Sequence, residues 1–195
     1  MYPPREDTFL LLPFAHVAPG TRLLEVGTGS GLAALAAAHD GARVVATDRN
    51  PHALHALRSR ARADGVDLAL VRTDLARGLG RFDRVLCNPP YLPTRPDERD
   101  PDRWQNLALD GGPDGCRVTA RFFEELPEHL AAGGEAFLVV SSRQDTGALE
   151  RIRSAWTARG GSAEVAVARE LEGERLEVWR LRRGSPEATD ASRRS

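Results

Sequence analysis

Residues 22–31 read RLLEVGTGSG, a short apolar segment that runs straight into a glycine-rich turn. The apolar part, residues 22–26, predicts a buried strand, and the segment after the glycines, LAALAAAH at residues 32–39, has the composition of a helix. A strand, a tight turn and a helix in this order begin a βαβ unit. The stretch therefore predicts an α/β fold, in which ligands bind beyond the carboxyl ends of the strands.

The same alternation continues along the chain. We expect further strands at residues 43–47, 67–71, 82–87 and 135–140, and helices at residues 8–16 (broken at Pro13), 51–63, 117–132 and 145–159. Two segments of alternating hydrophobicity, residues 163–168 and 176–181, predict a closing antiparallel hairpin. The pattern indicates a mostly parallel seven-stranded sheet with helices on both faces.

The charge balance excludes several classes of function. The 195 residues carry 27 basic and 28 acidic side chains, a formal net charge of −1, and all 27 basic residues are arginines. Without a lysine the chain has no phosphate-binding P-loop and no catalytic lysine. Near-neutrality gives no general attraction to the backbone of nucleic acids.

The remaining composition favours one cytoplasmic domain. Cys87 and Cys116 are too few for a disulfide scaffold or a four-cysteine zinc site, and the five histidines show no metal-binding spacing. No apolar run approaches the ~20 residues that cross a bilayer, and the N-terminus lacks the apolar core of a signal peptide. We expect a domain at residues 1–183, a disordered polar tail at residues 184–195, no metal and no membrane partner.

The glycine turn predicts a ligand of a particular kind. Gly27 and Gly29 let a ligand approach the backbone without meeting a Cβ atom. A dinucleotide fingerprint requires its third glycine at position 32, but Leu32 stands there and Gly31 comes one residue early. This spacing disfavours NAD or FAD as the ligand.

Acidic residues accompany the first three predicted strands at the same edge of the sheet. Asp48 ends the second strand, where an acid accepts the ribose hydroxyls of a nucleotide. Asp74 and Leu75 follow the third strand, where a carboxylate or a backbone amide meets the adenine edge. Glu25 in the first strand adds a third carboxylate, and three negative charges favour a cationic ligand. S-adenosylmethionine, with a sulfonium and an ammonium group, has this polarity.

The fourth predicted strand runs into Asn88-Pro89-Pro90-Tyr91, a segment stiffened by two prolines. The side-chain oxygen of Asn88 and the following carbonyl are suited to accept both hydrogens of a planar NH₂ group. Such nitrogens are poor nucleophiles, and accepting both N–H bonds stabilises the positive charge that develops during their alkylation. Tyr91 would stack on the planar group and orient it.

Together these features resemble the class I S-adenosylmethionine-dependent methyltransferases that carry an NPPY motif and modify planar nitrogens. More narrowly, the chain is similar to the HemK-like N5-glutamine methyltransferases. The opening YPPREDTFLL at residues 2–11 resembles the start of the short eukaryotic and archaeal branch, and ALDGGPDG at residues 108–115 is also typical of the family. The resemblance covers residues 2–182.

This resemblance implies a Rossmann-like fold, S-adenosylmethionine as cofactor and a protein substrate, the Gly-Gly-Gln loop of peptide chain release factors. The short branch also uses a small activating subunit. The implied catalytic residues are Asn88, Pro89 and Tyr91; the implied substrate contacts are Asn88, Pro89, Pro90 and Tyr91; the implied cofactor contacts are Thr8, Glu25, Gly27, Gly29, Asp48, Asp74, Leu75 and Asn88.

Other functions remain open from the residues alone. The amino group of adenine presents the same geometry, so an N6-adenine methyltransferase of RNA or DNA is the main alternative. Arg95, Arg99 and Arg103 would line its track, although four acids interleave them. A small-molecule N-methyltransferase and a cofactor-binding scaffold subunit without activity are the further alternatives.

Overall fold

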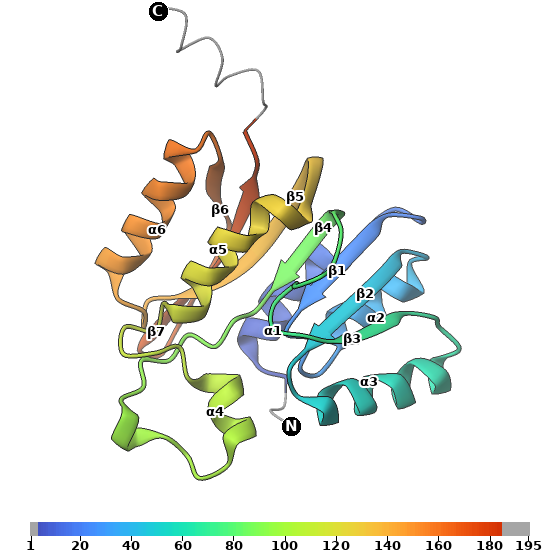
Figure 1. Cartoon of the computed structure of the whole chain (residues 1–195), viewed down its shortest axis with the longest axis horizontal. Helices are drawn as coiled ribbons and strands as arrows, with labels where there is room; N and C mark the ends of the chain where they lie inside the picture. Colours follow the sequence, from blue (N-terminus) through green and yellow to red (C-terminus); the bar gives the residue numbers. More distant parts are fainter. Residues whose placement is uncertain (1–3, 185–195) are drawn as a thin grey trace, which may run out of the picture.

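The computed structural model describes residues 4–184 and contains one seven-stranded sheet (Figure 1). Its elements are α1 (Glu6–Leu11), a 3₁₀ turn (Leu12–Ala15), β1 (Arg22–Val26), α2 (Leu32–His39), β2 (Arg43–Asp48), α3 (Pro51–Asp64), β3 (Ala69–Arg72), β4 (Phe82–Cys87), a second 3₁₀ turn (Pro96–Glu98), α4 (Arg103–Leu109), α5 (Arg117–His129), β5 (Leu130–Ser141), α6 (Thr146–Ala158), β6 (Ser162–Leu171) and β7 (Glu174–Arg182).

The strand order is β3-β2-β1-β4-β5-β7-β6, and β7 runs antiparallel to both of its neighbours. The other pairs are parallel, so the predicted mostly parallel sheet with a closing hairpin is confirmed. The chain order reverses between β1 and β4, which is where ligands bind in doubly wound folds.

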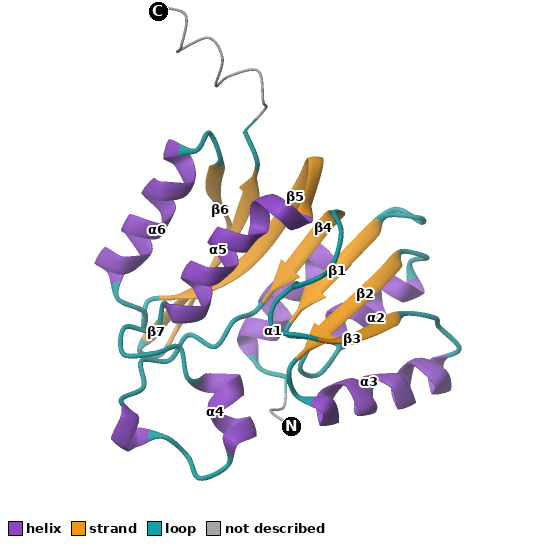
Figure 2. Ribbon diagram, viewed as in Figure 1, coloured by secondary structure: helices purple, strands orange, loops and turns teal. Residues whose placement is uncertain are grey.

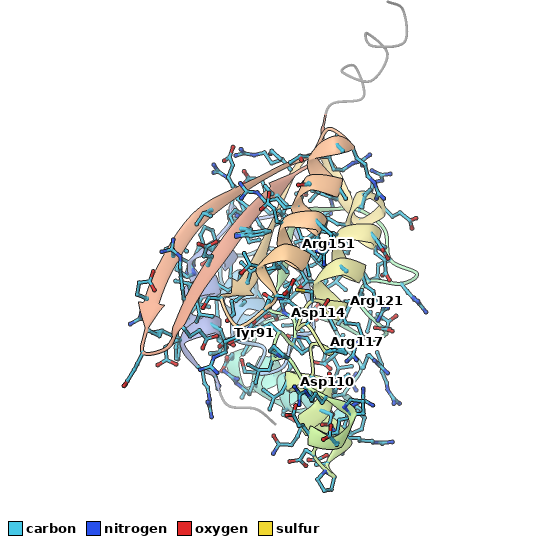
Figure 3. The ribbon with its side chains drawn as sticks, turned by 90° about the vertical axis from the view of Figure 1, so that its left-hand side faces the viewer. Tyr91, Asp110, Asp114, Arg117, Arg121 and Arg151 are labelled. Carbon is cyan, nitrogen blue, oxygen red and sulfur yellow. The ribbon has the colours of Figure 1, made fainter. Side chains whose placement is uncertain are left out.

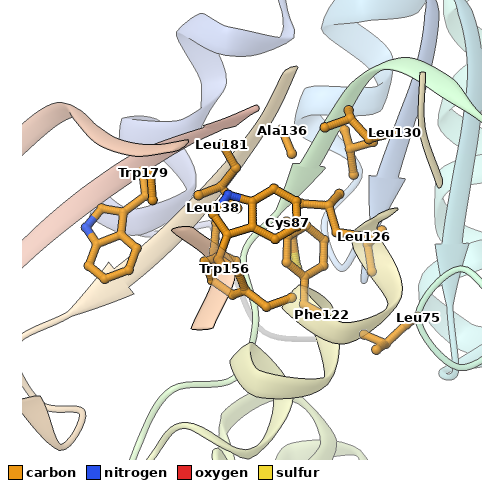
Figure 4. Packing of buried hydrophobic residues seen from close by; sticks show 14 of the residues in the cluster. Leu75, Cys87, Phe122, Leu126, Leu130, Ala136, Leu138, Trp156, Trp179 and Leu181 are labelled. Carbon is orange, nitrogen blue, oxygen red and sulfur yellow. The ribbon is translucent and has the colours of Figure 1, made fainter. Parts of the chain in front are cut away.

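Helices cover both faces of the sheet (Figure 2). One hydrophobic cluster packs α5 and α6 on the sheet through Phe122, Leu126 and Trp156, as the close view in Figure 4 shows. A second cluster packs α1, α2 and α3 against the opposite face through residues such as Leu11 and Leu57. The central strand β1 is buried at every position after Arg22, as a strand covered on both faces requires.

The prediction was wrong at the junction of α5 and β5. We expected the helix to continue to residue 132 and stop at Gly133-Gly134, but α5 ends at His129 and β5 begins at Leu130. The glycines instead lie inside β5, beside a register shift opposite Phe82. A Cβ atom on Gly134 would lie 3.0 Å from the carbonyl oxygen of Phe82, so glycine allows a close approach of two strands.

The connection after β4 is more regular than the sequence indicated. Within residues 88–115 it contains a 3₁₀ turn and the helix α4, whose first turn is capped by Asp102 accepting from the Trp104 N–H at 2.9 Å. The opening helix also ends earlier than expected, at Leu11, because Pro13 lies in a separate 3₁₀ turn. Asn50 caps α3 as predicted.

No helix among residues 4–184 is long and apolar enough to cross a membrane. Of the predicted tail at residues 184–195, all but the first residue lies outside the described part of the chain.

Candidate active site

One cavity of about 900 Å³ lies at the carboxyl ends of the parallel strands. It is lined by all eleven residues that the sequence singled out: Thr8, Glu25, Gly27, Gly29, Asp48, Asp74, Leu75, Asn88, Pro89, Pro90 and Tyr91. The structure therefore brings together residues from α1, from the ends of β1 to β3 and from the segment after β4.

The turn after β1 depends on its glycines. Gly27, Gly29 and Gly31 all have positive φ angles, between 49° and 74°, which side chains with a Cβ atom rarely adopt. A Cβ atom on Gly31 would lie 2.5 Å from the Leu57 side chain, so this glycine lets α2 begin close against α3. A Cβ atom on Gly27 would meet no protein atom within 4 Å. That position borders open space, as a cradle for a ligand does.

Glu25 is held at the floor of the cavity. Its Oε2 atom accepts hydrogen bonds from the Thr28 hydroxyl and from the Ala34 N–H at 3.1 Å. Burial raises the pKa of Glu25 to about 7, although both hydrogen bonds favour its ionised form. A cation bound beside Glu25 would restore its negative charge.

Asp48 is fixed by backbone donors at the end of β2. Its two carboxylate oxygens accept from the Gly29 N–H at 3.0 Å and from the Asn50 N–H at 2.7 Å. Burial raises the pKa of Asp48, although these hydrogen bonds favour its ionised form. The carboxylate is thereby aimed from β2 toward the glycine turn, where it suits a ribose diol.

Asp74, one of the three carboxylates predicted at this edge, is paired with an arginine. Both of its carboxylate oxygens accept from the guanidinium of Arg121 on α5, at 3.3 and 3.0 Å. The neighbouring Leu75 has a φ of 53°, the one positive value for a non-glycine residue within residues 4–184. Its carbonyl accepts from the buried Thr47 hydroxyl at 2.9 Å, which holds this strained residue in place. Sequence reasoning missed Arg121 and Thr47, since nothing in their spacing links them to this turn.

The segment after β4 carries an unsatisfied acceptor. The Oδ1 atom of Asn88 is buried and has no hydrogen-bond partner among the described residues. Leaving such an atom unpaired costs about 1–3 kcal/mol. Asn88 itself lines the cavity, so a ligand N–H that reached Oδ1 would supply the partner that this atom lacks.

Tyr91 is tied to the opening motif of the chain. Its hydroxyl lies 3.3 Å from Oδ2 of Asp7, and the other carboxylate oxygen of Asp7 accepts from the Thr8 N–H at 2.6 Å. Asp7 is 9% exposed. The sequence argument included Thr8 but missed Asp7, although the two are adjacent in the same motif.

The GGPDG segment, residues 111–115, packs against the main-chain carbonyl of Tyr91. Figure 3 labels Tyr91 together with Asp110 and Asp114 of this loop. A Cβ atom on Gly115 would lie 2.4 Å from the Tyr91 carbonyl oxygen and 3.3 Å from the side chain of Gln144. The buried Gln144 amide donates to the Gly115 carbonyl at 3.0 Å. Asp110 closes the same loop through ion pairs with Arg99 and Arg117, both 3.1 Å. Burial opposes the charge of Asp110, but the Gly112 N–H and these arginines hold its pKa below the usual value.

The helix α4 borders the cavity on the side of α3. The ring of Trp104 meets that of His52 edge-on at a centroid distance of 5.8 Å, and the Arg103 guanidinium lies 4.3 Å from the Trp104 ring. Within residues 4–184 no group of three His, Cys, Asp or Glu side chains is arranged to hold a metal ion.

Comparisons with known proteins agree on one family. The model of the methyltransferase small domain matches residues 6–106. The chain is 37% identical over 186 residues to a Methanocaldococcus jannaschii protein named "Putative protein N5-glutamine methyltransferase", covering 93% of this chain and 92% of that one. It is 38% identical to the release factor glutamine methyltransferase of Deinococcus radiodurans, over 83% of this chain and 60% of the relative.

A solved structure is similar along its whole length. It is the E. cuniculi Mtq2–Trm112 complex, responsible for methylation of the translation termination factor eRF1. The matched chain has a TM-score of 0.71 and 26% sequence identity, and the match covers 94% of this chain and 98% of that one.

Proposed function

The chain belongs to the methyltransferase small domain family as a HemK-like, protein-glutamine N5-methyltransferase-like enzyme, and we propose that it methylates a glutamine side-chain amide in a peptide chain release factor. The buried, unpartnered Oδ1 atom of Asn88 carries this proposal. A primary amide supplies the N–H donor that this atom lacks, and its planar nitrogen is the group that needs activation.

We propose S-adenosylmethionine as the methyl donor. The residues fit it on two observations: the open space in front of Gly27 and the buried carboxylate of Glu25 beside the glycine turn. Asp48 would accept the ribose hydroxyls, and Glu25 and Gly27 would hold the amino acid part of the cofactor. Asp74 and the Leu75 amide would contact the adenine. Thr8 and Gly29 would add contacts along the cavity wall. When bound, this cofactor supplies an electrophilic methyl group.

The protein's own contribution is to hold and polarise the acceptor amide. Asn88 Oδ1 and the Pro89 carbonyl would accept the two N–H bonds of the glutamine, which favours a pyramidal nitrogen and stabilises its developing positive charge. Pro89 and Pro90 fix the direction of these acceptors. Tyr91, steadied by Asp7, would orient the planar amide. The rest of the rate enhancement comes from alignment.

A protein acceptor is favoured over an adenine base. Of the three arginines available for a nucleic-acid track, Arg99 is paired with the buried Asp110, and Arg103 stacks on Trp104. These interactions occupy the charges that a phosphate groove would use. N6-methylation of adenine therefore stands as the alternative outcome of the test below.

We also include a small activating subunit in the proposal. The Mtq2 structure is a complex with Trm112, and the chain matches the Mtq2 chain over nearly its whole length. A Trm112-like protein should therefore be present in one arm of every assay.

The test is incubation of the purified protein with isotope-labelled S-adenosylmethionine and three acceptor classes: release factors, RNA and DNA, each with and without the small subunit. We expect label in a release factor, at a glutamine identified by mass spectrometry. The control is a release factor in which that glutamine is replaced by alanine. Label in RNA or DNA and none in protein would contradict the proposal, and cofactor binding without transfer to any acceptor would indicate a scaffold subunit.

A further inference from the structure

The cavity extends beyond the residues that the cofactor and the amide would occupy. Its lining also includes Pro4, Arg5, Arg143, Leu171, Glu174 and Leu176, a part that we call the hairpin arm; Leu171 and Leu176 belong to the same hydrophobic cluster as Tyr91. We propose that the hairpin arm binds the main chain of the acceptor polypeptide beside its methylated glutamine. This inference rests on the proposed function and adds a location for the rest of the substrate.

The position of the hairpin arm suits a neighbouring stretch of one polypeptide. Cys87 of β4 pairs with Leu138 of β5, so Asn88 is one strand away from Ser141 and about two residues short of it. Leu176 of the hairpin arm pairs with Ser141 one strand further on, so with usual strand spacings it lies roughly 12 Å from Asn88. An extended chain spans this separation in about four residues. A polypeptide whose glutamine amide reached Asn88 would therefore enter the hairpin arm within a few residues.

A polar pair is held ready in the hairpin arm. The carboxylate of Glu174 accepts from the Ser141 hydroxyl and lies 3.3 Å from Nε of Arg143. The side chain of Glu174 is 15% exposed, whereas that of Arg143 is 50% exposed. The two Nη groups of Arg143 make no hydrogen bond to residues 4–184, so their donors remain for a ligand in the cavity.

The loop that carries Arg143 is fastened to the hairpin. The Ser142 N–H donates to the Arg175 carbonyl, and the Arg175 N–H donates to the Ser142 hydroxyl, both at 2.9 Å. Buried Leu176, paired in register with Ser141, forms part of the cavity lining beneath the pair. The arrangement is thus built before the substrate arrives, which lowers the entropic cost of binding.

The charges of the hairpin arm favour a polypeptide over a nucleic acid as its ligand. Arg5 and Arg143 are accompanied in the hairpin arm by Glu174, and Glu6 lines the cavity next to Arg5. A nucleic-acid strand requires mostly cations, because each phosphate is negative. A peptide main chain offers N–H donors and carbonyl acceptors alike, which match a carboxylate and a guanidinium side by side. The hairpin arm is therefore suited to a polypeptide.

The experiment compares Arg143→Ala with a matched control on the neighbouring strand β7. Arg180→Ala removes another ion pair, Arg180–Glu164 at 2.9 Å, which lies outside the cavity lining. Three quantities are measured for each protein: affinity for a release factor by calorimetry, methyl transfer to it, and affinity for S-adenosylmethionine. We expect Arg143→Ala to weaken release-factor binding about 10-fold, as loss of a charge-assisted hydrogen bond does, with cofactor affinity unchanged. Arg143→Lys should recover part of the loss, and Arg180→Ala should change neither affinity.

The outcomes separate this inference from the proposed function. If Arg143→Ala leaves release-factor affinity and methyl transfer unchanged, the proposed role of the hairpin arm is wrong and the proposed function still stands. Weakened binding without methyl transfer by any variant, the parent protein included, would support the hairpin arm and overturn the proposed function. A parent protein that neither binds nor methylates a release factor would overturn both.

Discussion

The two halves of the cavity are prepared to different degrees. On the side of β1 to β3 every carboxylate is already held: Glu25 by Thr28 and Ala34, Asp48 by two backbone N–H groups, and Asp74 by Arg121. On the side of β4, the key acceptor Asn88 Oδ1 has no partner among the described residues. We therefore propose that the half beside β1 to β3, the cofactor half, is preorganised for a ligand that binds in a single way. In this proposal the half beside β4 keeps a polar group unsatisfied until the acceptor arrives.

The largest effect should come from removing that unpaired acceptor. Asn88→Ala is expected to lower methyl transfer by about 10³-fold, because an electrostatic contact of the transition state is lost. Cofactor affinity should change only a few-fold, since the held carboxylates remain. Single-turnover rates and equilibrium dialysis measure the two quantities. An equal loss of methyl transfer and of cofactor affinity would show that Asn88 serves the cofactor, and would contradict the division of the cavity into two halves.

The support beneath Asn88 and Tyr91 provides the second test. A Cβ atom on Gly115 would lie 2.4 Å from the Tyr91 carbonyl oxygen, so Gly115→Ala must displace the reacting segment. We expect about a 100-fold loss of turnover, because small misplacements of reacting groups are costly. Gly65→Ala is the control: its φ of 69° is similarly strained, but its Cβ atom would meet nothing within 4 Å. If both variants lose turnover alike, backbone strain and not the contact with Tyr91 is responsible.

These two halves also differ in how far the sequence predicted them. Glu25, Asp48 and Asn88 were predicted at one site because they lie at or next to the ends of strands, and parallel strands bring their carboxyl ends to one edge. The pairing of Asp74 with Arg121 joins positions 47 residues apart, and no local pattern predicts it. The contact of Asp7 with Tyr91 spans 84 residues.

The wrong boundary at Gly133-Gly134 has the same origin. Glycines after a helical segment usually end it, but here Gly134 allows a close approach between β4 and β5. Local signals thus predict which residues stand at the ends of elements. Contacts between distant elements decide what those residues do.

The third prediction concerns the buried acid of the cofactor half. The pKa of Glu25 is raised from 4.5 to about 7 by burial, so the folded protein binds this proton more tightly than the unfolded chain. Its contribution to stability is therefore greatest below about pH 4.5 and is lost as the pH rises through about 7. Glu25→Gln removes this titration while keeping an oxygen for Thr28 and Ala34. Its stability relative to the parent protein should increase by up to about 3 kcal/mol between pH 4.5 and 7.5.

Thermal unfolding of both proteins across this range measures the difference, without added cofactor. Glu172→Gln makes the same substitution on the exposed turn between β6 and β7 and serves as the control. A difference between Glu25→Gln and the parent protein that does not change with pH would mean that burial does not raise the pKa of Glu25. The cofactor half would then be less strictly prepared than its hydrogen bonds indicate.

The smallest effect concerns the contact that joins the two halves. Trp104 on α4 meets His52 on α3, so α4 reaches from the acceptor side to the helix that follows Asp48. An aromatic contact of this kind contributes about 0.5–1.5 kcal/mol, which corresponds to a 2- to 10-fold change in a rate. We expect Trp104→Ala and His52→Ala each to speed cofactor dissociation by that factor in stopped-flow measurements. The double variant should be no faster than the single ones, because both remove one contact.

His55→Ala, one turn along the same helix face and exposed, is the control. If the increases in dissociation rate of the two single variants add in the double variant, or if His55→Ala gives the same increase, the contact between Trp104 and His52 does not link the two halves.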